Sequence, residues 1–581
     1  MMQFDTIIKN GIIVDGSRMP RFQGDIGIKN GKIAKIGQLN ASDAAKVLDA
    51  SGLIVAPGFI DVHTHYDAQV HWDPYCTIGG WHGITSLTIG NCGFGFAPVH
   101  PKDAERAMLA LSRNEAIPLD PMKQTMSFDW ETFPQWMDHL DRLPLGVNIS
   151  HLVPISPLVA YAMGGFAEAK LRLPNEKETE KIIQLFHEAM QCGAVGWGAQ
   201  RLFPESTASV QRDYDGSPMI SDVLPDDFYL RMATALQKHE SGFIQINQAS
   251  STPSDSGFGL QRDFNFSVQL AAESKHPVVY NALVANDKVP EPLRMQLQLL
   301  SDAVAKGIPV YALGATVRAP FTINFKDWNL FDDNETWREA TLGTVEEKRA
   351  KLAKPEIRQA LRKEYDAGTP TRDFVFGELP RFIAQKIVRA DLRDKFQGLT
   401  LAEIASREKK HVIDAMLDIT VADNLETEWL GPVTNSNPEY HKEMMSSLAS
   451  IPGASDGGAH IKFLTLGTYP TDMLTWLVRD TGMLTLEEAH FRLSGLAARA
   501  TQFHDRGILR EGLAADIVMY DLNKLKILPQ EIAYDLPAGE WRRVQKAEGY
   551  RWIMVNGQVT FEDGKCTGAT PGRLLRFGRS V

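Results

Sequence analysis

Short apolar segments alternate with longer amphipathic segments through the middle of the chain, and this alternation limits the possible folds more than any other feature. Strand candidates lie at residues 84–89, 146–149, 195–198, 243–247, 278–282, 309–313 and 449–455. Helix candidates fall between them, for example at residues 176–191, 226–239, 264–274 and 292–306. Parallel strands need helical crossovers of this kind. The pattern predicts the α/β class, with a parallel barrel whose active-site loops follow the strand C-termini.

Both ends of the chain have a different character, because they alternate apolar and polar residues around tight-turn dipeptides. Asn10-Gly11, Asn30-Gly31, Asn556-Gly557 and Asp563-Gly564 interrupt such segments. These dipeptides favour the positive φ angles of tight hairpins. We therefore expect one small β domain that is built from both termini.

These patterns give provisional domain limits. Residues 1–57 and 501–581 form the two parts of the β domain, and residues 58–500 form the barrel. The segment at about 328–445 breaks the alternation because it is charged and rich in helix-forming residues. We interpret it as a helical insertion over the barrel mouth, with its charges on a solvated helix face.

Composition excludes several classes of partner. The 581 residues include 44% hydrophobic and 23% charged residues, and the formal net charge is −11. An acidic balance argues against binding to nucleic acid or to an anionic membrane. Four cysteines do not make a disulfide framework in so long a chain, which favours a cytoplasmic location. We see neither a signal peptide nor an apolar run that would span a bilayer.

The pair His63 and His65 follows an apolar strand candidate at residues 53–62. Residues i and i+2 of a strand project from the same face, so both imidazoles are expected to point the same way. That arrangement suits two nitrogen ligands of one divalent metal, most often zinc. The alternative is two histidines with a purely structural role.

Two further residues follow strand candidates. Cys92 lies among glycines after residues 84–89, and a thiolate can bind a divalent metal. Asp456 lies near the end of the last strand candidate, where a carboxylate can contact a metal and move a proton. Taken singly, Cys92 fits an inert buried thiol and Asp456 fits a local turn. Their order after the histidine pair makes the metal site the stronger interpretation.

With these motifs in place, the chain resembles the amidohydrolase superfamily, and within it the D-aminoacylase or N-acyl-D-amino-acid deacylase group. The segments that carry the resemblance are residues 57–67 (PGFIDVHTHYD), 90–98 (GNCGFGFAP), 455–460 (SDGGAH), 507–518 (GILREGLAADIV), 535–539 (DLPAG) and 555–557 (VNG). The resemblance implies a TIM-like barrel beside a small β-sandwich formed by both termini. It implies zinc bound by His63, His65, Cys92 and Asp456, and hydrolysis of an amide with Asp456 as general acid and base.

The chain also departs from that group. Two further metal-binding histidines are usual at the ends of the fifth and sixth strands, where this chain has Asn247 and Ala282 in our alignment. Asparagine is a poor zinc ligand compared with imidazole. We therefore predict one tightly bound zinc ion and regard a second as doubtful. Candidate substrate-binding residues are Gln245, Asn247, Asn281 and His460.

The sequence thus favours a zinc-dependent hydrolase of a small-molecule amide, with an N-acyl-D-amino acid or a related N-acyl compound as the preferred substrate class. One alternative is an amidohydrolase of another substrate class, such as a cyclic amide, carbamate, lactone or amidine. Another is a non-catalytic binding or assembly member. Because barrel enzymes of this superfamily often self-associate, the resemblance also implies a homo-oligomer.

Overall fold

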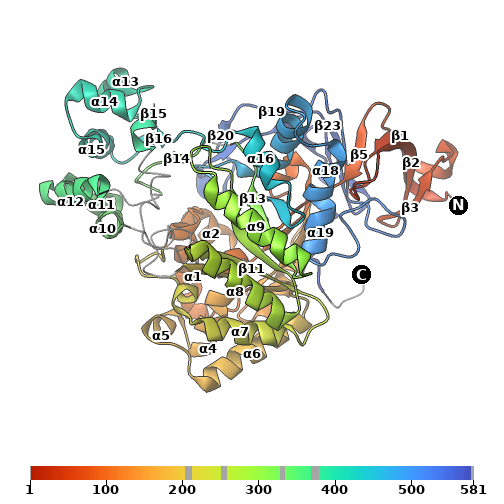
Figure 1. Ribbon diagram of the computed structural model, residues 1–581, viewed down its shortest axis with the longest axis horizontal. Helices are drawn as coiled ribbons and strands as arrows, with labels where there is room; N and C mark the ends of the chain where they lie inside the picture. The colour runs from red at the N-terminus through yellow and green to blue at the C-terminus, as the bar shows by residue number, and fades with distance from the viewer. Residues whose placement is uncertain are drawn as a thin grey trace.

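The two ends of the chain meet in one sheet. The computed structural model describes residues 2–202, 212–249, 258–318, 320–327, 334–367 and 378–577 (Figure 1). Nine strands form this sheet in the order β25-β24-β23-β18-β5-β1-β2-β3, with β4 on β1. Their bounds are β1 Phe4–Ile13, β2 Phe22–Lys29, β3 Lys32–Gly37, β4 Ala44–Asp49, β5 Ile54–Pro57, β18 Ile517–Tyr520, β23 Tyr550–Val555, β24 Gln558–Glu562 and β25 Lys565–Cys566. The pair β5 and β18 joins the N-terminal to the C-terminal strands.

Three of the four expected tight turns are hairpins. Asn30 and Gly31 connect β2 to β3, and Asn556 and Gly557 connect β23 to β24, each with positive φ at both residues. Residues 563 and 564 do the same between β24 and β25. The expectation for Asn10 is wrong, because Asn10 has φ 62° inside β1, where the register against β2 shifts. An Asn-Gly pair therefore marks positive φ, and the pairing of the strands decides between a turn and a bulge.

The middle of the chain carries parallel strands, as the alternation predicts. Two parallel sheets have the orders β6-β7-β8 and β17-β13-β12-β11-β10-β9. The strands are β6 Phe59–Asp61, β7 Ile84–Ile89, β8 Asn148–His151, β9 Val153–Pro154, β10 Gly196–Leu202, β11 Phe243–Ala249, β12 Val278–Val284, β13 Val310–Ala315 and β17 Ser450–Gly453. Only Leu152 separates β8 from β9, and a parallel bridge joins Thr64, just past β6, to Gly457, just past β17.

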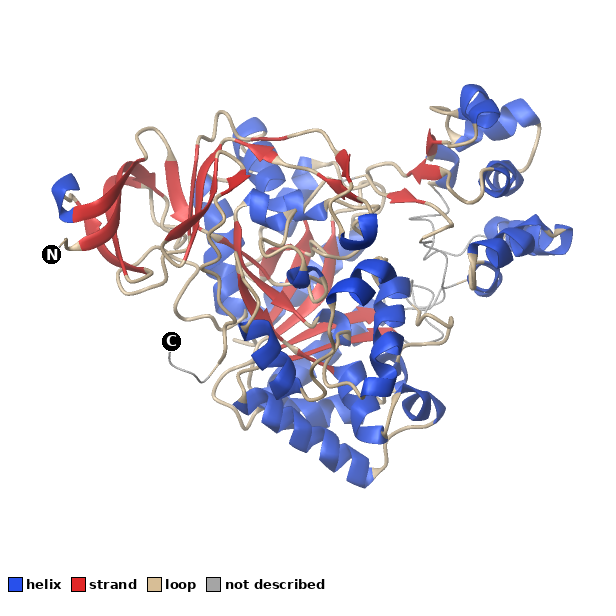
Figure 2. Ribbon diagram, turned by 180° about the vertical axis from the view of Figure 1, so that it is seen from behind, coloured by secondary structure: helices blue, strands red, loops and turns tan. Residues whose placement is uncertain are grey.

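Helices surround these strands (Figure 2). They are α1 Ala104–Asn114, α2 Leu119–Thr125, α3 Phe133–Asp141, α4 Ile155–Met163, α5 Phe166–Leu171, α6 Glu176–Gln191, α7 Asp226–Leu236, α8 Phe258–Ser274, α9 Glu291–Ala305, α17 Tyr469–Asp472, α18 Leu486–His490 and α19 Ala497–Ala500. Helix α6 begins where the sequence predicts it, because Asn175 and Glu178 form a capping box. The structure is therefore of the mixed α/β class.

The apolar run at residues 53–62 differs from its prediction as one strand. It divides at Gly58 into β5, in the sheet of both termini, and β6, in the parallel sheet. A Cβ atom on Gly58 would lie 2.2 Å from the Thr85 hydroxyl, so only glycine lets the backbone pass β7 at this point. Uniform burial hid this division from the sequence, since both halves are apolar.

A separate core holds the helix-rich segment. Its helices are α10 Glu335–Ala340, α11 Val345–Ala353, α12 Pro355–Asp366, α13 Ala390–Phe396, α14 Leu401–Glu408 and α15 Val412–Ala422, and its strands β14 Thr322–Ile323, β15 Ile383–Lys386 and β16 Glu428–Leu430 form one sheet. Helix α16 Pro438–Met444 packs instead on the main core through Met444. Helices α10 to α15 project from the main body on the side opposite β1 to β3 (Figures 1 and 2). The predicted start at residue 328 lies outside the described residues.

Acid pH should destabilise this fold through buried neutral histidines. Burial lowers the pKa of His82 to about 4 and that of His490 to about 3. His490 lies between the ring of Phe59 and the hydroxyl of Tyr520, to which its Nε2 is 2.7 Å away. An unfolded histidine takes up a proton near pH 6.5, whereas these folded histidines do not. Their full contribution to the free energy of unfolding is therefore present above pH 6.5 and is lost as the pH falls below it.

As the pH falls from about 6.5 to the pKa of the folded histidine, each such histidine lowers the free energy of unfolding by at most about 1.4 kcal/mol per pH unit. We expect the midpoint of urea unfolding to fall as the pH is lowered from 6.5 to 5. His490→Gln should flatten that dependence, and the exposed His504→Gln should not. An unchanged pH dependence in His490→Gln would contradict this account of the buried imidazole.

The described part of the chain contains no helix that is both long and apolar enough to cross a bilayer. The four cysteines are all free thiols, and Cys76, Cys92 and Cys192 are buried.

Candidate metal centre

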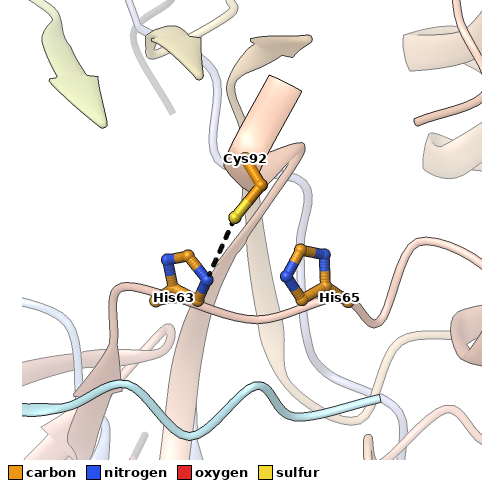
Figure 3. Close-up of side chains that lie close together, drawn as sticks. All are labelled: His63, His65 and Cys92. Carbon is orange, nitrogen blue, oxygen red and sulfur yellow. Dashed lines mark hydrogen bonds between the residues drawn. The ribbon is translucent and has the colours of Figure 1, made fainter. Parts of the chain in front are cut away.

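Three predicted ligands converge beyond the ends of β6 and β7. Candidate ligand atoms of His63, His65 and Cys92 all lie within 4.8 Å of one another, and all three residues are buried. In Figure 3, Cys92 points from the turn after β7 toward the two imidazoles. The imidazole centroids of His63 and His65 are 5.3 Å apart, with the rings nearly perpendicular. The two histidines thus face one space, as their spacing predicts.

The separations match the edges of a metal polyhedron. Cys92 Sγ is 3.6 Å from His63 Nε2, and Asp456 Oδ1 is 3.2 Å from the same nitrogen. A tetrahedral zinc ion, with Zn–N of about 2.0 Å and Zn–S of about 2.3 Å, would separate nitrogen from sulfur by about 3.5 Å and nitrogen from oxygen by about 3.4 Å. Two imidazoles, a thiol and a carboxylate are also a donor set that zinc prefers. The residues present therefore fit a zinc ion.

Asp456 is fixed beside the histidines by the backbone of its own loop. The His65 amide donates a hydrogen bond to the Gly457 carbonyl oxygen at 2.6 Å. Gly458, with φ 91°, approaches so closely that a Cβ there would lie 2.5 Å from the His65 carbonyl oxygen. Asp456 itself contacts His63, but it is not within the mutually close trio. This loop geometry leaves the Asp456 carboxylate about one-third exposed, at 33%, next to buried imidazoles.

Positive neighbours keep Asp456 ionised. Burial alone would raise its pKa, but the hydrogen bond with His63 and the charges of His63, His65 and His460 outweigh burial and lower the pKa to about 2. Such a carboxylate carries its negative charge throughout the neutral range. Asp456 can therefore bind a cation or accept a proton from an acid that forms beside it.

The Cys92 thiol has the opposite tendency. Burial raises its pKa well above the usual range, and the nearby carboxylates of Glu115 and Asp456 raise it further. A hydrogen bond from the Asn247 side chain works against this rise. The Cys92 amide donates to Gln245 Oε1 at 2.9 Å. A thiolate at this position needs a cation beside it.

The predicted substrate-binding residues lie around the same space. Asn281 Nδ2 is 2.9 Å from Nδ1 and 3.2 Å from Nε2 of His63. Neither Asn281 Oδ1 nor Gln245 Nε2, both buried, has a hydrogen-bond partner among the described residues. Buried amide groups normally have partners, so these two atoms point to a bound species.

Sequence reasoning missed Glu115, which the structure brings to this site. Glu115 is 1% exposed, and its carboxylate lies 3.3 Å from His460 Nε2 and 3.7 Å from His65 Nε2. Burial would raise its pKa, but the charge of His65 and the hydrogen bond and charge of His460 lower it. Its surroundings, RNEAIPL, have no metal-binding spacing, so the sequence offers no signal for it.

Asp61 was also missed. The Ser455 hydroxyl donates to Asp61 Oδ2 at 2.6 Å, and the His63 amide donates to Asp61 Oδ1 at 3.3 Å. Burial raises the pKa of Asp61 to about 7. Asp61 thus ties the strand before the histidines to the loop that carries Asp456.

Two related proteins align with this chain over nearly their whole length. The profile of the amidohydrolase family matches residues 46–561. An N-acyl-D-glutamate deacylase of Alcaligenes xylosoxydans xylosoxydans is 31% identical over 582 aligned residues, which cover 100% of this chain and 98% of that protein. A D-aminoacylase of the same organism is 24% identical, with 98% of this chain and 97% of that protein covered.

A solved structure supports the fold. The N-acyl-D-glutamate deacylase of Bordetella bronchiseptica, complexed with zinc and a phosphonate inhibitor, has a TM-score of 0.66 at 20% identity, and 99% of each chain is covered. The matches define a metal-dependent hydrolase that acts on carbon–nitrogen bonds other than peptide bonds. This chain belongs to the amidohydrolase family, in its D-aminoacylase-like group.

Proposed function

We propose that this chain is a zinc-dependent hydrolase that cleaves the amide bond of N-acyl-D-amino acids. The zinc ligands would be His63, His65, Cys92 and Asp456. The observation that carries the proposal is the convergence of His63, His65 and Cys92 on one buried space, with the Asp456 carboxylate beside it. Relatives that act on N-acyl-D-glutamate and on other N-acyl-D-amino acids support the substrate class.

Zinc, when bound, would lower the pKa of a water molecule and polarise the scissile carbonyl. Asp456, ionised and partly exposed, would accept the proton of the attacking water and deliver it to the departing nitrogen. The unpartnered amide atoms of Gln245 and Asn281 would bind the substrate amide, and Asn247 and His460 would line the same space. Burial of Gln245 and His460 would limit the access of bulk water to the reacting atoms.

Amide hydrolysis with defined handedness tests this proposal. Freshly purified protein should hydrolyse N-acyl-D-amino acids at least about ten times faster than their L-enantiomers; in free energy this is about 1.4 kcal/mol. Release of the free amino acid would be measured across matched D and L substrates, together with a hydantoin and an aryl amide. A preference for the hydantoin would instead support the cyclic-amide alternative. An L-hydantoinase of Arthrobacter aurescens shares the fold, with a TM-score of 0.53 at 15% identity.

We also propose a single tightly bound zinc ion. A related D-aminoacylase has a binuclear metal centre, whereas this chain has Asn247 and Ala282 where two further metal-binding histidines are usual in that group. Elemental analysis after dialysis should give about one zinc per chain, because amide groups bind zinc weakly compared with imidazole. Two zinc ions per chain after dialysis would refute the proposal.

We also propose how the strands close into a barrel and where the domains begin and end. The near-continuity of β8 with β9 and the bridge between Thr64 and Gly457 support one closed TIM-like barrel, beside a β-sandwich from both termini. We propose the limits 1–57, 58–500 and 501–581, with the helical insertion at about 328–445. A crystal structure tests the closure, and limited proteolysis tests the insertion as a separate unit.

Finally, we propose that the enzyme is a cytoplasmic homo-oligomer without nucleic-acid or membrane partners. The acidic net charge of −11 supports the absence of such partners. Light scattering in solution would reveal a monomer if the proposed self-association is wrong, and cell fractionation tests the location.

A further inference from the structure

The C-terminal end of helix α1 places a side-chain carboxylate beside the metal centre, although this helix is not part of the parallel strands. Helix α1 ends at Asn114, and Glu115 is its capping residue, with its amide donating to the Leu111 carbonyl oxygen at 2.9 Å. The C-terminal end of a helix carries partial negative charge, so a carboxylate is unfavourable there. Burial makes it more unfavourable still, because Glu115 is only 1% exposed. The fold therefore places a charge here that positive neighbours must balance.

Those neighbours belong to the metal centre. The Glu115 carboxylate contacts His460 Nε2 at 3.3 Å and lies 3.7 Å from Nε2 of His65, one of the proposed zinc ligands. In addition, the His460 amide donates to the Glu115 carbonyl oxygen at 2.6 Å. Glu115 therefore fastens the loop that carries Asp456 at two points, and its carboxylate faces both imidazoles.

We propose that Glu115 is a positioning residue of the metal centre, which orients His460 and adds, beside His65, the negative charge that favours a divalent cation. Glu115 supplies negative charge to the metal centre, which the neutral amides of Asn247 and Asn281 beside Cys92 and His63 do not. The Glu115 carboxylate contacts His460 Nε2 and adds negative charge 3.7 Å from Nε2 of His65, and loss of such an outer partner of a metal ligand weakens metal binding by about 10–100-fold. This inference rests on the proposed function, because it needs a metal at His63 and His65.

Glu115→Gln tests the proposal, since it keeps the size of the side chain and the backbone contact with His460 but removes the charge. Zinc affinity would be measured by competition with a chromophoric chelator on the full-length protein. We expect the zinc Kd to rise by about 10–100-fold. Glu115→Asp, which keeps the charge at a shorter reach, should fall between Glu115→Gln and the unmodified chain. The absorption spectrum of the cobalt-substituted protein should shift in Glu115→Gln.

Glu105→Gln is the matched control, because Glu105 lies in the same helix but is 63% exposed and pairs with Lys123. Its zinc Kd should not change. If Glu115→Gln fails to fold, Glu115→Asp carries the test, and a zinc Kd equal to that of the unmodified chain overturns the inference. A folded Glu115→Gln with unchanged zinc affinity and cobalt spectrum overturns it as well. An unmodified chain that binds no zinc refutes the proposed function itself, which is a separate result.

Discussion

Asp456→Asn should give a folded, zinc-containing protein whose kcat is lower by at least about 10³-fold. Asparagine keeps the shape of the side chain, but it cannot accept a proton at neutral pH, and general acid–base catalysis supplies about 10²–10⁴-fold in rate. The residue is ionised at neutral pH, since its pKa is lowered to about 2, and its side chain is 33% exposed next to buried ligands. The loss should fall on kcat more than on KM, because binding groups remain in place.

The measurement is steady-state kinetics with an N-acyl-D-amino acid, combined with zinc analysis and circular dichroism of the same sample. Asp227→Asn, at an exposed position in the first turn of α7, is the control and should retain full activity. If Asp456→Asn kept both its zinc and more than about a tenth of its turnover, Asp456 would not be the proton acceptor.

His63→Gln should remove metal and activity together. The His63 imidazole is central to the cluster, since Cys92, Asp456 and Asn281 all lie within 3.6 Å of its ring nitrogens. A catalytic metal supplies several kcal/mol of transition-state stabilisation. Its loss should therefore lower kcat/KM by on the order of 10³-fold or more. Zinc content and kcat/KM would be measured after dialysis against a metal-free buffer.

His504→Gln is the control, because His504 is exposed and should leave zinc content unchanged. Chelation of the unmodified protein should reproduce the loss seen in His63→Gln, and added zinc should reverse it in the unmodified protein alone. Full activity of His63→Gln at normal zinc content would place the metal elsewhere.

Much of the site was predictable because its main ligands follow strands. In parallel α/β proteins the strand ends meet at one edge, so His63, Cys92 and Asp456 were expected together from their order alone. The contribution of Asn281 was harder to predict from the sequence, since amides at strand ends serve many purposes. The structure brings Asn281 to His63 across 218 residues of sequence.

Glu115 and Asp61 could not be predicted in this way. Glu115 follows a helix in the long connection between β7 and β8, where no strand order fixes the position of a side chain. Asp61 belongs to the predicted strand, but its partner Ser455 is 394 residues away. A buried carboxylate is recognised by what surrounds it, and that information is absent from local spacing.

The amino-acid sequence by itself determined local features: the capping box that starts α6, the positive φ angles at residues 30–31, 556–557 and 563–564, and the shared direction of the His63 and His65 side chains. These depend on backbone preferences and short-range hydrogen bonds, which neighbouring residues set. Only the tertiary structure decided that residues 53–62 divide between two sheets, that residue 10 forms a bulge, and that Glu115 reaches the metal centre. The reason is that burial and charge balance are properties of the packed chain. In the folded protein, the surroundings of a buried group are made by residues far away in the sequence.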